Sequence, residues 1–223
     1  MKLENNLKVL CSKVGVDFDQ LLSDLGVESV HELSIFDLQT ISEEYEIDMQ
    51  TLLFHTVGLN AHLKAKLAKI KLLVLDVDGV MTDGGMYFTE NGDQIKKYNT
   101  KDGLAIMQTI KDGMQVAIIS SGFAPGMVQK RADMLGIQHC IVTREKKIDI
   151  LRQLMVEMNL DFDQVAMIGD DVNDLEVMKS IGIAACPVDA VPAIKSVSHI
   201  HLKKKGGEGC VREFLDEYLN NPA

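Results

Sequence analysis

Two aspartates with one residue between them are the first group in the sequence that could carry out chemistry. Asp76 and Asp78 follow the run Lys71–Leu75, whose composition is typical of a buried parallel strand, and Gly79 comes next. Carboxylates at this spacing can bind a divalent cation, and one can act as a nucleophile while the other transfers protons. Because Asp and Gly also favour turns, the same residues could serve only to turn the chain.

A second acidic group follows another apolar run. Val165–Ile168 has the same strand-like composition, and Asp170, Asp171 and Asp174 come directly after it. Aspartates gathered at one place repel one another, and a bound cation would offset that repulsion. The two acidic groups together therefore indicate a metal site.

A hydroxyl and an ammonium complete the groups that could act on an anionic substrate. Ser120 follows the apolar run Val116–Ile119, where its hydroxyl could donate to a phosphoryl oxygen, and the adjacent Ser121 could take that role instead. The alternative for Ser120 is the N-cap of a helix. Lys147 lies between Ser120 and the second acidic group in the sequence. Its ammonium could bind an anion, or it could simply lie exposed on a helix.

These residues need elements that bring them together, and the chain from residue 70 onward alternates strands with helices. We expect strands at Lys71–Leu75, Val116–Ile119, Cys140–Val142, Val165–Ile168 and Ile183–Ala184, and helices over 104–110, 127–135, 148–158 and 175–181. This alternation predicts an α/β fold, a Rossmann-like parallel sheet with helices on both faces. Ligands of such sheets lie beyond the carboxyl ends of the strands, where the candidate residues are. The segment Gly85–Tyr98 predicts a β-hairpin with an Asn91-Gly92 turn.

The first part of the chain predicts a separate, small all-α domain. Leucines recur at helical spacing, and Asp17 and Ser34 stand where N-caps belong, so we expect four or five short helices, the last around 59–68. Residues 1–60 hold eleven acidic residues and three lysines, which accounts for −8 of the net charge of −10. We place this acidic domain over 1–66, as an interaction or oligomer-stabilising module, and the second domain over 67–223.

Composition narrows the class of protein. With 46% apolar and 25% charged residues, the 223-residue chain is typical of a soluble globular protein. Its acidic balance speaks against nucleic-acid binding, and the absence of a run of about 18 apolar residues speaks against a membrane span. The start of the chain shows no signal peptide, and the four cysteines are scattered. We therefore expect reduced thiols and a cytoplasmic protein.

The order of these motifs resembles the haloacid dehalogenase superfamily of phosphohydrolases with an aspartate nucleophile. The chain presents Asp76-Val77-Asp78-Gly79-Val80, then a strand before Ser120, then Lys147, and then the run that begins at Gly169. The resemblance implies phosphomonoester hydrolysis, in which Asp76 attacks phosphorus to form an aspartyl-phosphate. Asp78 would protonate the leaving alcohol and then activate water.

The same resemblance implies Mg²⁺ as cofactor. Its ligands would be the Asp76 carboxylate, the Asp78 backbone carbonyl and Asp170. Ser120 and Lys147 would offset charge on the phosphoryl group. Asp171 and Asp174 would position the metal-bound water or Lys147.

The spacing of the motifs predicts a core without a cap domain. Asp76 and Ser120 are 44 residues apart, and Ser120 and Lys147 are 27 apart. Neither interval can hold a separate domain beside the expected hairpin, helices and strand. The site is then open, so either the substrate is large or a neighbouring subunit supplies the lid.

The flanking sequence resembles one family more closely. Asp76–Gly85, the hairpin, Tyr98–Gly103 and Lys205–Glu213 resemble the 3-deoxy-octulosonate 8-phosphate phosphatases, whose relatives act on sialic-type nonulosonate 9-phosphates. The resemblance implies a Mg²⁺-dependent homotetramer in which hairpins contribute to the subunit interface and a neighbour's Gly-rich tail can close the site. The substrate-binding residues that we infer are Lys101, Ser121, Gly122, Gly207 and Glu208.

Two departures from this family concern the substrate. Ser121-Gly122-Phe123 follows Ser120, where the family usually has Gly and then Arg or Glu, and the run is closer to that of phosphoserine phosphatases. The tail reads Gly206-Gly207-Glu208-Gly209, where octulosonate enzymes usually have Arg in place of Glu. The alternatives are therefore a nonulosonate phosphatase, a phosphatase for a phosphoserine-like ester, and a non-catalytic regulatory protein on the same fold.

Overall fold

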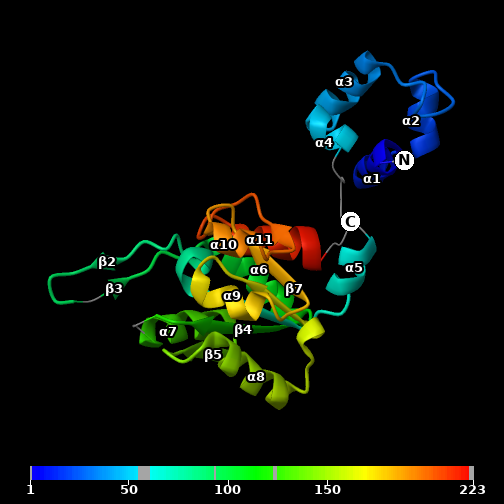
Figure 1. Cartoon of the computed structure of the whole chain (residues 1–223). Coiled ribbons are helices and arrows are strands. Elements are labelled where there is room, and N and C mark those ends of the chain that lie inside the picture. Colours follow the sequence, from blue (N-terminus) through cyan, green and yellow to red (C-terminus); the bar gives the residue numbers. More distant parts are fainter. Residues whose placement is uncertain (1, 55–60, 93, 123–124, 221–223) are drawn as a thin grey trace. The chain divides into compact units, whose positions relative to one another are not determined.

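The computed structural model describes residues 2–54, 61–92, 94–122 and 125–220. The chain divides into two compact units, Met1–Lys64 and Ala65–Pro222, and the sequence-based boundary lies close by, between residues 66 and 67. Figure 1 shows the helices and strands of each unit.

The first unit is helical, as predicted. Its helices are α1 (Lys2–Val14), α2 (Phe18–Asp24), α3 (Ile35–Glu44) and α4 (Met49–Phe54), and α5 (Ala61–Leu67) extends past the boundary between the units. Asp17 caps α2 by accepting hydrogen bonds from two backbone amides, and Ser34 forms a capping box with Asp37 at the start of α3. The buried side chains of Leu7, Ile41 and Leu52 belong to one apolar core. Residues 59–60, where the connecting helix was expected to begin, lie outside the described residues.

The second unit is built on a parallel sheet of six strands, which confirms the predicted fold class. The strands are β1 (Leu72–Leu75), β4 (Gln115–Ser120), β5 (His139–Val142), β6 (Val165–Ile168), β7 (Ile183–Cys186) and β8 (Ile200–His201). Their order is β5-β4-β1-β6-β7-β8. The four residues of β1 are fully buried, as expected for a central parallel strand covered on both faces.

Helices cover both faces of this sheet. On one face, α8 (Lys147–Met158), α9 (Leu175–Met178) and α10 (Pro192–Lys195) share a core with alternate residues of β1, β4, β6 and β7. On the other face, α6 (Thr100–Lys111) packs against β4, α7 (Pro125–Leu135) and α11 (Cys210–Phe214). Val77–Met81 is an irregular turn, and Phe162–Gln164 and Val172–Asp174 are 3₁₀ turns. Leu215–Leu219 forms a short π-helix directly after α11. Among the described helices, none is long and apolar enough to cross a membrane.

Helix α9 ends three residues before the predicted position. Gly182 lies directly against the backbone of Asp163, where an added Cβ would come within 2.4 Å of the Asp163 carbonyl oxygen. The Gly182 amide also donates to the carbonyl of Phe162. The helix must end before this contact. The apolar periodicity continues to Ile181 and therefore overestimates the length of the helix.

The predicted hairpin is present, but its turn differs. Strands β2 (Tyr87–Phe88) and β3 (Gln94–Ile95) pair antiparallel, with Phe88 opposite Gln94. The Gly92 amide donates to the Thr89 carbonyl, so the turn is centred on Glu90-Asn91, and Gly92 follows it with a left-handed φ of 85°. The hairpin projects from the body of the sheet unit (Figure 1).

We predict that Ile41→Ala destabilises the first unit by about 3 kcal/mol, because Ile41 is 1% exposed and its loss leaves a cavity. Hydrogen exchange followed by mass spectrometry should show faster exchange in peptides from residues 2–54 and unchanged exchange in β1 and β6. Phe36→Ala on the same helix is the control, since Phe36 is 76% exposed and should change little. Equal effects of the two substitutions would contradict the assigned core.

Candidate active site

Three neighbouring strands end at one place. In the sheet β1 lies between β4 and β6, with Leu75 opposite both Ile118 and Ile168. Asp76 therefore follows β1 beside Ser120, the last residue of β4. A pocket of ≈ 300 Å³ opens here, lined by Asp76, Asp78, Asp170 and Asp171 and by Ser120–Gly122. A larger cavity of ≈ 690 Å³ lies at the amino ends of β1 and β4, away from these aspartates.

A buried lysine joins two of the aspartates. The Lys147 ammonium lies 2.8 Å from Asp76 Oδ1 and 2.6 Å from Asp174 Oδ1, and all three residues are less than 5% exposed. Burial lowers the pKa of Lys147, but attraction by Asp76 and Asp174 outweighs it, so its pKa lies above the ordinary value. An exposed helix position for Lys147 is therefore excluded. Asp174, predicted to position Lys147, is its partner.

Asp170 completes a group of three carboxylates that could hold a metal ion. One oxygen from each of Asp76, Asp170 and Asp174 lies within 4.8 Å of the others. Asp170 Oδ1 is buried and has no hydrogen-bond partner among the described residues. A buried carboxylate oxygen without a donor is costly, and a divalent cation with oxygen ligands is the partner that suits it. The residues present therefore fit Mg²⁺.

The electrostatics of this group agree with that fit. Burial, and then the Asp174 carboxylate, raise the pKa of Asp76 to about 7 against the opposing effect of Lys147. Burial, and then the carboxylates of Asp76, Asp174 and Asp171, raise the pKa of Asp170 to about 8. One ammonium does not compensate for this many carboxylates, so further positive charge would stabilise their ionised forms.

Gly79 allows the first loop to approach the second acidic group. Its φ is 85°, and a Cβ at this position would lie 2.0 Å from Asp170 Oδ2. Any other residue here would be strained by the left-handed backbone conformation. Its side chain would also clash directly with Asp170, a candidate metal ligand. The glycine after the two aspartates is therefore a requirement of the site as well as of the turn.

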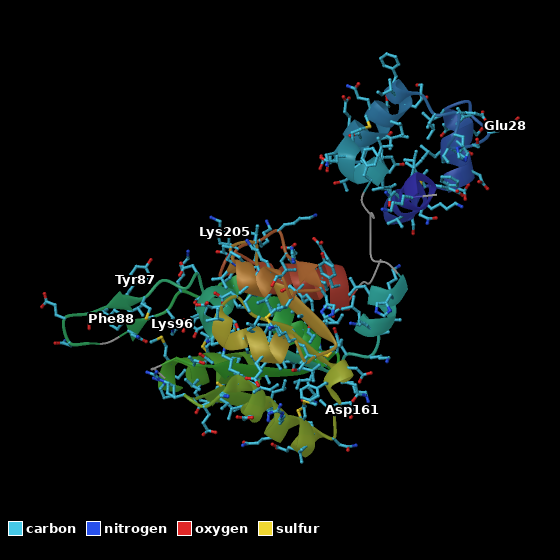
Figure 2. All side chains as sticks on the ribbon, viewed as in Figure 1. Glu28, Tyr87, Phe88, Lys96, Asp161 and Lys205 are labelled. Carbon is cyan, nitrogen blue, oxygen red and sulfur yellow. The ribbon has the colours of Figure 1, made fainter. Side chains whose placement is uncertain are left out.

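The side chain of Asp78 makes different contacts from that of Asp76. Its Oδ1 forms an ion pair with Lys96, whose side chain is 4% exposed, and Thr82 Oγ1 lies 3.5 Å away. Lys96 follows β3 and lines the same pocket (Figure 2). Lys96 is not among the residues predicted from the sequence, which include Lys101 as a substrate-binding lysine. Strand alternation along the hairpin could have indicated Lys96.

The predicted phosphoryl-binding residues lie together. Ser120 is 1% exposed, and its hydroxyl oxygen accepts a hydrogen bond of 3.2 Å from the Gly122 amide. This contact is within the loop after β4, and α7 begins only at Pro125, so Ser120 is not the N-cap of that helix. Ser121 and Gly122 also line the pocket, and residues 123–124 lie outside the described residues.

Other predicted residues lie at the edge of the site or outside it. Asp171 is exposed, lines the pocket and accepts a hydrogen bond from the Val172 amide. Lys101 is exposed on the first turn of α6 and is not among the residues that line the pocket. Its contact with substrate stays a prediction.

The Gly-rich tail supports the loop that carries Asp76 and Asp78. The Gly207 amide donates to the Val80 carbonyl at 2.9 Å, and a Cβ on Gly206 would lie 2.0 Å from the Gly79 carbonyl oxygen. Glu208 is exposed, and its amide donates to the Lys205 carbonyl. Gly207 and Glu208 do not line this pocket, and their predicted substrate contacts would involve a neighbouring chain.

Comparison with known proteins identifies the family of this chain. A family model described as haloacid dehalogenase-like hydrolase matches residues 101–182. The 3-deoxy-D-manno-octulosonate 8-phosphate phosphatase KdsC of Yersinia pestis is 38% identical over 152 residues, covering 68% of this chain and 81% of that protein.

Two solved structures extend the comparison. The Moraxella catarrhalis 3-deoxy-D-manno-octulosonate 8-phosphate phosphatase, in complex with magnesium, phosphate and KDO, has a TM-score of 0.68 and 30% identity, covering 71% of this chain and 90% of that one. The cobalt-bound phosphatase YrbI of Haemophilus influenzae has a TM-score of 0.66 and 34% identity, covering 70% and 90%.

The parallel sheet and the aspartates at its strand ends define a hydrolase of the haloacid dehalogenase class, and the chain is a phosphatase. Within this class, it belongs to the family of the 3-deoxy-D-manno-octulosonate 8-phosphate phosphatases. The alternative of a non-catalytic binding protein is thereby set aside.

We predict that Gly79→Ala lowers Mg²⁺ affinity at least about tenfold, because the added methyl group displaces Asp170. Titration calorimetry measures the affinity, and phosphate release should fall with it. Gly92→Ala is the matched control, since Gly92 has the same φ of 85° but nothing within 4 Å of its Cβ position. If both variants bind Mg²⁺ equally, the close approach of Gly79 is unimportant.

We also predict that stabilisation by Mg²⁺ increases with pH. The folded-state pKa values of Asp76 and Asp170 lie above the ordinary value of about 4, so their contribution to stability is complete below about pH 4 and is lost as pH rises through about 7 and about 8. Bound Mg²⁺ offsets the repulsion between the ionised groups. The Mg²⁺-induced rise in Tm should therefore grow from about pH 6 to about pH 9. Asp170→Asn should flatten this trend, and a constant rise in the wild type would contradict it.

Proposed function

We propose that this phosphatase uses Mg²⁺ to hydrolyse a phosphorylated sugar acid of the 3-deoxy-octulosonate 8-phosphate type. The observation that carries the proposal is the convergence of Asp76, Lys147 and Asp170 at the strand ends of a chain from this family. The relative from Moraxella catarrhalis was solved with magnesium, phosphate and KDO, which supports both the cation and the class of substrate.

The first half of the proposed reaction transfers the phosphoryl group to Asp76. The described contacts of Asp76 with the Val77 amide and Lys147 both use Oδ1, so Oδ2 is the oxygen that attacks phosphorus. As the bond from Oδ2 to phosphorus forms, the bond from phosphorus to the ester oxygen breaks. Asp78 gives its proton to that oxygen, and the sugar alcohol leaves.

The second half returns Asp76 to its starting state. Asp78 takes a proton from a water molecule, whose oxygen attacks the phosphorus of the aspartyl-phosphate. The bond between phosphorus and Asp76 then breaks, and inorganic phosphate leaves. Asp78 ends this half protonated, ready for the next substrate.

The surrounding groups stabilise the charge on the phosphoryl group. Lys147 pairs with Asp76 and offsets part of its charge. Ser120 and Ser121 line the same pocket, and their hydroxyls would donate to phosphoryl oxygens. Asp76 and Asp170, with the Asp78 carbonyl as the resemblance implies, would hold Mg²⁺. When bound, the ion supplies positive charge beside the transferring group.

Nonulosonate 9-phosphates are the second candidate substrates. The tail of this chain carries Glu208 where octulosonate enzymes usually have Arg, and nonulosonate relatives can carry Glu. Loss of the Arg removes a charge-assisted partner for an anionic sugar acid. Both candidates are sugar-acid phosphates and require the same chemistry at Asp76.

We further propose a homotetramer in which the hairpin contributes to the interface. Met86, Tyr87, Phe88 and Ile95 are each more than half exposed, and Tyr87 and Phe88 lie on the projecting hairpin (Figure 2). An apolar surface of this kind is typical of association.

We predict that kcat/KM is highest on 3-deoxy-octulosonate 8-phosphate or a nonulosonate 9-phosphate and at least about tenfold lower on phosphoserine and simple sugar phosphates. Mg²⁺-dependent phosphate release on each ester measures it. Equal, low rates on every ester would contradict the assigned substrate class.

The control for this experiment is Asp76→Asn, which should abolish phosphate release from every ester because the amide cannot replace the nucleophile. Asp83→Asn in the same loop should retain activity, since Asp83 pairs with Lys97 and does not line the pocket. Retained wild-type activity in Asp76→Asn would show that the nucleophile is misassigned.

A further inference from the structure

The hairpin forms one wall of the pocket, and the positive charge of the pocket lies on this wall. Of the described residues that line the pocket, four are aspartates and one, Lys96, is a cation. The substrate of a phosphatase is itself an anion. The Lys96 ammonium is therefore a group to which an anionic part of the substrate can bind directly.

Strand alternation explains why Lys96 faces inward. Gln94 and Lys96 both line the pocket, whereas Ile95 is 57% exposed and the Lys97 side chain is 68% exposed. Gln94 Nε2 lies 3.6 Å from Met86 Sδ, and Gln94 Oε1 is buried with no hydrogen-bond partner among the described residues. The inner face of the hairpin thus presents an ammonium and an unpaired acceptor to the same space.

This wall lies on the leaving-group side of the pocket. Lys96 is paired with Asp78 Oδ1, and under the proposed function Asp78 gives its proton to the leaving oxygen. The groups beside Asp78 therefore face the sugar acid, while Ser120, Lys147 and Asp170 surround Asp76 and the phosphoryl group.

We propose that Lys96 and Gln94 recognise the leaving group, with Lys96 binding the carboxylate of the sugar acid and Gln94 Oε1 accepting a hydrogen bond from one of its hydroxyl groups. This inference rests on the proposed function and specifies which residues read the substrate. When the substrate carboxylate replaces Asp78 as the partner of the Lys96 ammonium, Asp78 no longer faces a cation. Asp78 then binds a proton from solvent and is free to give it to the leaving oxygen.

Desolvation makes this exchange selective. A nearly buried ammonium is costly without an anionic partner, so Lys96 does not leave Asp78 unless another anion replaces it. A carboxylate can do so, whereas a hydroxyl group leaves most of the charge uncompensated. A phosphate ester without a carboxylate would bind with Asp78 still engaged, and its kcat would be low as well as its affinity.

The test compares a carboxylated phosphate ester with a pentose phosphate, which has no carboxylate. Lys96→Met should lower kcat/KM for the carboxylated ester by about 10–100-fold. For the pentose phosphate kcat/KM should stay the same or rise, because the substitution also frees Asp78 from its ion pair. Lys96→Arg, which keeps the charge, should recover part of the loss. Lys97→Met is the matched control, because Lys97 is the next residue, faces outward and pairs with Asp83 at 3.7 Å, and it should leave both substrates unaffected.

Equal losses on the two esters would overturn the proposal and assign Lys96 to the phosphoryl group or to Asp78 alone. No loss on either ester would overturn it as well. A Mg²⁺-induced rise in Tm equal to that of the wild type shows that Lys96→Met is folded. The carboxylated ester used in this comparison of kcat/KM is the one that the wild type hydrolyses fastest. If that ester is not a sugar-acid phosphate, the proposed function fails while this test still gives an answer.

Discussion

The concentration of carboxylates at the ends of β1 and β6 is the constraint on which the site depends. Asp76, Asp170 and Asp174 bring ligand oxygens within 4.8 Å of one another, and Lys147 is the buried cation among them. Burial, and then repulsion between these carboxylates, raises the pKa of Asp76 and of Asp170. The fold holds the carboxylates together against this repulsion, and the result is a place where a divalent cation binds favourably and an anionic substrate can follow it.

Much of the surrounding scaffold holds the aspartate loop in this position. A side chain at Gly79 would clash with Asp170. A side chain at Gly206 would clash with the backbone of the aspartate loop. The Gly207 amide and the Cys210 thiol both donate to the Val80 carbonyl. The C-terminal tail is thus part of the support for the loop that carries Asp76 and Asp78.

The open pocket explains why the hairpin matters. No cap domain interrupts the described core between β1 and α8, so the walls beyond the strand ends come from short segments. The hairpin supplies one wall with Gln94 and Lys96, and its outer face carries exposed Tyr87 and Phe88. The proposed substrate contacts and the proposed subunit interface therefore lie on opposite faces of one short element. The acidic helical unit has a core of its own.

Features that are local in the chain could be predicted from the amino-acid sequence. Apolar runs followed by Asp76, Ser120 and Asp170 predicted both the strands and the convergence of their ends, because a parallel sheet places carboxyl ends together. The caps of α2 and α3 were predictable for the same reason, since a cap contacts backbone within three residues.

Contacts between distant segments could not be predicted in this way, because they form only when the chain folds. Lys96 meets Asp78 across 18 residues, and Cys210 meets Val80 across 130. Periodicity and motif spacing describe which way a residue faces on its own element, but they do not state which surface lies opposite. That depends on how the hairpin and the tail pack against the loop. For this reason the sequence predicts Lys101 as a substrate-binding lysine, whereas in the folded chain Lys96 lines the pocket.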